Sequence, residues 1–163
     1  MAIVVGTDTY ISVADADSYW ANRNNTVWAA AVTAAKEAAL REATQYLDGK
    51  YTFIGQITSV DQLLAWPRFG ATITAGNKKG VTYDSTEYPP QLTNSCAELA
   101  LEALSARLAP AEERGGAIKR ERVDIIEVEY MDFAPSGKTY NFVLMLIKEI
   151  TTGLGSHKKL VRC

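Results

Sequence analysis

The clearest hydrophobic pattern in the sequence runs through residues 88–108, where apolar side chains recur at steps of three and four. This spacing predicts a helix. It has two apolar faces, one made of Leu92, Cys96, Leu99 and Ala103 and the other of Ala97, Leu101, Leu104 and Leu108. A helix that is apolar around most of its circumference needs neighbours on several sides. We therefore expect this helix to be the buried centre of the domain.

Prolines and glycines mark the two ends of this helix. Pro89 and Pro90 fit a first helical turn, where the missing N–H costs nothing and φ is already set. Pro110, followed by Gly115 and Gly116, predicts the end of the helix and a linker beyond it. We assign Pro89 and Pro90 a structural role on this basis.

Two further helices are predicted in the first fifty residues. One opens at Ser12, which forms an approximate capping box with Asp15, and we expect Asp15 and Asp17 to lie in water near the helix start. The other covers residues 27–47 at helical spacing, with Gly49 expected as a left-handed C-cap.

The last predicted helix covers residues 139–150. Its apolar side includes Phe142, Leu146 and Ile150, whereas Lys148 and Glu149 lie on the other side. A flexible, basic tail containing Lys158, Lys159 and Arg162 follows it. Such a tail is usually solvated or docked on a partner.

One strand is predicted, over residues 123–130. Alternation places Ile126, Val128 and Tyr130 on one face, but Val123 and Ile125 on the other. Either a bulge near residues 125–126 restores a single apolar face, or neighbours cover both faces. The strand must pair with the N-terminal extended residues, with the region of Tyr51, or with a strand of another subunit.

Trp66, Pro67 and Arg68 predict a buried corner. Pro67 restricts the residue before it to extended conformations, so a short helix should end at Trp66. We expect Arg68 to pack over the tryptophan ring and to pair with an acid, with phosphate or partner binding as the alternative. All three residues are assigned a structural role.

The glycine-containing stretch 70–87 is expected to be a surface loop or a weak hairpin. It carries Lys78 and Lys79 between Gly76 and Gly80 but lacks the spacing of a phosphate-binding Walker loop. We interpret it as a mobile interaction loop.

These elements predict a mainly α fold, namely a small bundle of about four helices with a short β element and an extended C-terminal arm. Residues 1–110 should form the helical core domain. Residues 111–163, with the linker, the strand, the C-terminal helix and the basic tail, should form a docking arm.

Composition limits the possible partners. The chain has 163 residues, 47% hydrophobic and 22% charged, with a net charge of −2. This argues against a broad basic face for duplex nucleic acid. No apolar run approaches the roughly 20 residues that a bilayer requires, so we expect no membrane partner. The two cysteines, Cys96 and Cys163, favour synthesis in a reducing cytoplasm.

Catalytic signatures are missing from the sequence. The only histidine, His157, lies in the glycine-containing tail, so a nucleophile would lack its usual base. No cluster of His, Cys or acidic residues has metal-ligand spacing, and no phosphate loop, dinucleotide fingerprint or nucleophile elbow occurs. We predict a protein that is not an enzyme and holds neither metal nor cofactor.

The order of stretches resembles a family of small tailed-phage proteins. The similarity is carried by G-T-D-T-Y-I-S-V-A-D-A-D-S-Y-W, by D-Q-L-L-A-W-P-R, by Y-P-P-Q-L with its Ala/Leu helix, and by V-D-I-I-E-V-E-Y. Members are often labelled DnaT-like single-stranded-DNA-binding proteins. They also resemble the helical head–tail connectors, or adaptors, that lie under the portal ring.

The resemblance implies a structural adaptor in the neck of the virion, assembled in the host cytoplasm. Its expected partners are the portal protein, further copies of itself in a ring, expected to be dodecameric, a tail or neck completion protein, and in passing the packaged DNA. Side-by-side contacts that close would make such a ring. The expected partner-binding residues are Phe142, Leu146, Ile150, Lys158, Lys159 and Arg162.

The alternative is single-stranded-DNA binding during phage replication. This needs aromatic stacking platforms beside a basic groove. Candidate groups are Lys78 and Lys79 with Tyr83 and Tyr88, or Lys119, Arg120 and Arg122 with Tyr130. In a ring the same basic residues would face the DNA channel or an acidic patch on the portal.

Overall fold

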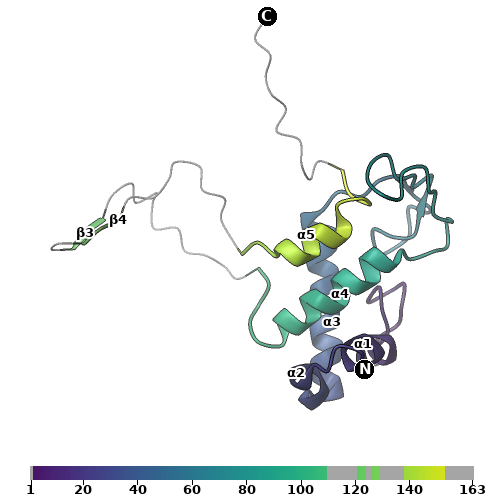
Figure 1. Ribbon diagram of the computed structural model, residues 1–163. Helices are drawn as coiled ribbons and strands as arrows, with labels where there is room; N and C mark the ends of the chain where they lie inside the picture. Colours follow the sequence, from purple (N-terminus) through teal and green to yellow (C-terminus); the bar gives the residue numbers. More distant parts are fainter. Residues whose placement is uncertain (1, 110–120, 124–125, 129–137, 153–163) are drawn as a thin grey trace, which may run out of the picture. The chain divides into compact units, whose positions relative to one another are not determined.

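The computed structural model describes residues 2–109, 121–123, 126–128 and 138–152 (Figure 1). It divides into a helical body, Met1–Leu108 with Tyr140–Cys163, and a second unit, Ala109–Thr139. Five helices and two small two-stranded sheets occur in the described part. The prediction of a mainly α fold is confirmed.

The helix α4 (Pro90–Ala103) is the centre of the helical body. It packs against α3 (Thr33–Lys50) and α5 (Asn141–Ile147), which lie beside it in Figure 1. Its fully buried side chains include Leu92, Cys96 and Leu99. Burying one leucine contributes about 1.5–3 kcal/mol. The predicted central helix is therefore confirmed, with Pro89 as its N-cap and Pro90 at the first helical position.

The predicted helix over residues 27–47 is wrong in its first part. The chain instead forms a short helix, α2 (Thr26–Ala30), and α3 begins after Ala31 and Val32, both of which are extended. The break lets α2 pack on α1 (Val13–Ala21), which brings Trp28 within 6.5 Å of Trp20 between ring centroids. Burial of two indoles outweighs the continuity of one helix.

The end of α3 also differs from the expectation. Gly49 lies inside the helix, which continues to Lys50, and Tyr51 ends it in an extended conformation. The segment after it turns at once into an antiparallel bridge between Phe53 and Thr151. A left-handed glycine cap is therefore replaced by pairing of residues 52–54 with residues 150–152.

The corner around Trp66 contains no short helix. Its sheet consists of β1 (Gln56–Ile57) and β2 (Arg68–Phe69), which pair antiparallel. Trp66 is completely buried, and its peptide bond to Pro67 is cis. Phe53 and Tyr83 pack edge-on against its ring. The buried corner is thus present, but turns build it.

Stretch 70–87 is a weak hairpin, as the sequence allowed. Ile73 N–H donates to the Val81 carbonyl at 2.8 Å, and Gly80 N–H donates to the Ile73 carbonyl at 2.7 Å. Ile73 is buried under the hairpin. At its tip Gly76 has a φ of +89° and lies against Glu149, which accepts from the Asn77 N–H at 3.0 Å.

The second unit contains a hairpin of β3 (Glu121–Val123) and β4 (Ile126–Val128). The two strands pair antiparallel, with Val123 opposite Ile126 and Glu121 opposite Val128. The predicted single strand over 123–130 is therefore wrong. Partners that lie opposite each other belong to one face of a sheet, so pairing within the hairpin removes the need for a bulge.

The C-terminal helix packs into the helical body. Val143, Ile147 and Ile150 are buried, and Ile150 accepts from the Ile54 N–H at 3.0 Å. A docking arm over residues 111–163 stays a prediction, but α5 itself contributes to the core. We expect that removal of α5 disrupts the fold.

Truncation after Gly137 should therefore unfold the body. Losing three buried aliphatic side chains at about 1.5–3 kcal/mol each approaches the whole stability of an ordinary domain. Circular dichroism during urea unfolding would measure this. A chain ending at Thr152 is the control, because it keeps every described contact, and a cooperative transition in the shorter chain would contradict the assignment of α5 to the core.

Candidate functional site

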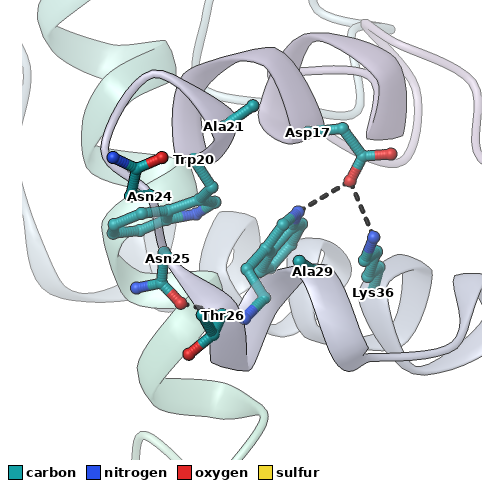
Figure 2. A pocket seen from close by; sticks show the side chains of 9 residues that line it. Asp17, Trp20, Ala21, Asn24, Asn25, Thr26, Ala29 and Lys36 are labelled. Carbon is teal, nitrogen blue, oxygen red and sulfur yellow. Dashed lines mark hydrogen bonds and ion pairs between the residues drawn. The ribbon is translucent and has the colours of Figure 1, made fainter.

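A pocket of about 520 Å³ opens between α1, α2 and the first turn of α3 (Figure 2). Two tryptophans and two asparagines contribute to it, together with small side chains and one acid–base pair. The lining residues are Asp17, Trp20, Ala21, Asn24, Asn25, Thr26, Trp28, Ala29 and Lys36. Its volume lies within the usual range for small-ligand sites, about 300–1,000 Å³.

Asp17 holds the three helices together at one side of the pocket. Its Oδ1 accepts from Trp28 Nε1 at 2.7 Å and from Lys36 Nζ at 2.8 Å, as the dashed lines in Figure 2 show. The Lys36 side chain is only 10% exposed, whereas that of Asp17 is 46% exposed. The expectation that Asp17 is a solvated helix-start acid is therefore wrong, because the α2–α3 break brings two buried donors to it.

The turn between α1 and α2 supplies the carboxamides. Asn24 has a φ of +51°, a conformation that asparagine adopts more readily than most residues. Asn25 caps α2, because its Oδ1 accepts from the Trp28 N–H at 2.9 Å. Its Nδ2 amide is thereby left to face other partners.

Trp20 lines the pocket with an unsatisfied donor. The residue is only 5% exposed, and its Nε1–H is buried without a hydrogen-bond partner among the described residues. A buried N–H without an acceptor costs about 1–3 kcal/mol. The pocket thus contains an unused donor next to apolar ring surface.

A second polar cluster lies near α3 and the Trp66 corner. Tyr10 donates its hydroxyl to Asp48 Oδ1, and the Ala65 N–H donates to Asp48 Oδ2 at 3.0 Å. Burial raises the pKa of the Asp48 carboxyl, although both hydrogen bonds act in the opposite direction. Every role of this cluster that we can trace joins segments of the fold.

Arg68 is held by backbone oxygens. Its guanidinium donates to the carbonyls of Ile54 at 2.7 Å, Gly55 at 2.8 Å and Ala65 at 3.0 Å. Burial lowers its pKa, whereas the nearby Asp48 raises it. These contacts join both sides of the β1–β2 sheet.

The expected partner-binding residues of α5 are separated by burial. Phe142 is 50% exposed, Leu146 is half-buried and Ile150 is fully buried. Only Phe142 offers a large accessible area. The tail residues Lys158, Lys159 and Arg162 lie outside the described residues.

The expected DNA-facing residues are also divided. Lys78 and Lys79 are exposed at the tip of the 70–87 hairpin, but Tyr83 is buried and Tyr88 is half-buried. Lys119, Arg120 and Tyr130 lie outside the described residues, and Arg122 falls in β3. The first aromatic–basic set therefore offers little ring surface.

Sequence reasoning missed the pocket entirely. Trp20 and Trp28 lay in helices predicted to be separate from each other, and the Asn24–Asn25 pair was interpreted as a polar turn. The usable signal was Asn25 three residues before Trp28, the spacing of a helix cap. An N-cap there predicts that a new helix starts close to the first one.

Two kinds of site are not seen in the part of the chain that the structure describes. No three His, Cys, Asp or Glu side chains come together there as metal ligands would. Every helix there is too short or too polar to span a bilayer.

Comparison with known families gives one result. Residues 2–163 match the family described as "Putative DnaT-like ssDNA binding protein". The chain belongs to this family. Neither the curated proteins nor the solved structures contain a significant match. The resemblance to the DnaT-like family is thus confirmed, and the connector role stays a prediction.

Replacing Asp17 tests the joint of the pocket. Asp17→Ala should lower the free energy of unfolding by about 2–3 kcal/mol, because it leaves Trp28 Nε1 and Lys36 Nζ buried without an acceptor. Asp17→Asn keeps an acceptor oxygen and should cost less. Urea denaturation followed by tryptophan fluorescence measures both.

Asp61→Ala is the matched control, since it removes the same charge from an exposed loop residue. Its effect should stay within about 0.5 kcal/mol. Equal losses for Asp17→Ala and Asp61→Ala would show that Asp17 does not join the helices.

Proposed function

We propose that this protein binds single-stranded DNA. The observation that carries the proposal is membership of a DnaT-like family described by that activity, over residues 2–163. This match favours DNA binding over the connector role that the order of stretches first suggested. The functional groups are then to be sought on the helical body itself.

Local charges must supply the attraction for DNA, because the net charge is −2. Lys78 and Lys79 project from a hairpin whose tip is held to Glu149. Arg23 lies directly before Asn24, with its guanidinium 3.5 Å from the centroid of the Tyr19 ring. Cations held in this way can contact phosphates one by one.

Binding of a fluorescent oligodeoxythymidylate, followed by anisotropy, tests the proposal. Affinity should fall as salt rises, with a slope of about −0.7 for each phosphate contacted. Replacing both Lys78 and Lys79 by alanine should reduce the magnitude of that slope by about 1.4, because two contacts are lost.

A control with the same loss of charge combines Lys148→Ala with one lysine change at a time. Lys148 is exposed on the C-terminal side of α5, and its replacement should leave the slope unchanged. No measurable binding at 50 mM salt, an ionic strength of about 0.05 M at which phosphate contacts are strong, would overturn the proposal.

A second candidate is the head–tail connector, which one observation favours. Large apolar side chains are widely exposed on the helical body, among them Val60 at 91%, Leu63 at 73% and Phe69 at 67%. Exposed apolar side chains that gather into patches mark protein contacts. In this reading copies meet side by side in a ring, on the portal and next to a neck completion protein.

The copy number of the protein in purified virions distinguishes the two functions. A connector should be present at about one copy per portal subunit, as a closed ring stacked on the portal requires. Quantitative mass spectrometry against the portal protein measures the ratio. Absence from virions would exclude the connector and leave DNA binding.

A further inference from the structure

The pocket between α1 and α2 contains polar groups that the fold does not use. Trp20 Nε1–H is buried without an acceptor, and the residue lines the pocket. Asn25 uses Oδ1 to cap α2 and keeps its Nδ2 amide for another partner. Asn24 adds an exposed carboxamide, which can both donate and accept.

The charges at the other side of the pocket neutralise each other. Lys36 pairs with Asp17 at 2.8 Å, and Trp28 Nε1–H donates to the same carboxylate oxygen. An ionic ligand would therefore gain little from this side. The remaining walls are indole edges and the small side chains of Ala21 and Ala29. The pocket suits a neutral, flat molecule with hydrogen-bonding edges.

We propose that this pocket receives one nucleobase of single-stranded DNA. A base combines an apolar ring with adjacent donors and acceptors, which asparagine side chains can bind in pairs. A carbonyl or ring nitrogen of the base supplies the acceptor that Trp20 Nε1–H lacks. Arg23, exposed beside Asn24, then lies close enough in the chain to contact the backbone of the same strand.

This inference rests on the proposed DNA-binding function and adds the place where a base is held. Two of the three tryptophans of the chain line the pocket. Entry of a base should therefore change the tryptophan fluorescence. A strand that lacks bases should bind through phosphate contacts without that change.

The test compares a 12-nucleotide oligodeoxyadenylate with an abasic strand of the same length, a probe size of about 4–16 nucleotides being usual for such sites. Anisotropy reports binding and tryptophan emission reports entry into the pocket. Asn24→Gly removes the carboxamide while permitting the positive φ. Asn25→Asp keeps the cap of α2 but removes the amide donor.

Both variants should weaken binding of the oligodeoxyadenylate about tenfold, within the range for a lost base contact, and leave the abasic strand unaffected. Asn22→Ala, in the same turn but outside the pocket lining, should change neither. Thermal unfolding of each variant confirms that it is folded.

The possible failures are distinguishable. Equal affinity for both strands without a change in tryptophan emission would overturn the base pocket and leave DNA binding intact. Unchanged affinity of the folded Asn24→Gly and Asn25→Asp variants for the oligodeoxyadenylate would do the same. Absence of binding to either strand would overturn both the pocket and the proposed function.

Discussion

The burial of α4 on several sides is the constraint on which the rest of the helical body depends. Because Leu92, Cys96 and Leu99 are fully buried, the helix needs cover from both α3 and α5. The need for cover draws the C-terminal helix into the core, although a linker-containing stretch separates it from α4 in the sequence. Burial also raises the pKa of the Cys96 thiol to about 12, so this cysteine acts as a small apolar residue.

A second constraint operates at the N-terminal end of the bundle. The break at Ala31 and Val32 gives up helical hydrogen bonds between α2 and α3. In return it buries Trp28 beside Trp20 and brings both Trp28 and Lys36 to Asp17. The fold thus builds a pocket from residues that a continuous helix would have kept apart, and it leaves the Trp20 indole N–H without an acceptor.

The two candidate functions use different surfaces of the body. DNA binding would use isolated cations and the pocket between α1 and α2, since a broad basic face is incompatible with a net charge of −2. A connector would instead use exposed apolar side chains such as Val60 and Phe69, which are 91% and 67% exposed. Family membership supports the first and the apolar exposure supports the second. The functions are compatible in one molecule, because a ring around a DNA channel meets both kinds of partner.

The sequence by itself determined the central helix, the mainly α class and the corner at Trp66. Helical spacing and paired prolines act over a few residues, so they survive any tertiary arrangement. Only the tertiary structure decided the split of α2 from α3, the pairing of β3 with β4 and the inclusion of α5 in the core. Only it showed that Asp17 joins three helices and that a pocket lies beside it. These outcomes depend on which distant side chains share a buried volume, and periodicity along the chain does not contain that information.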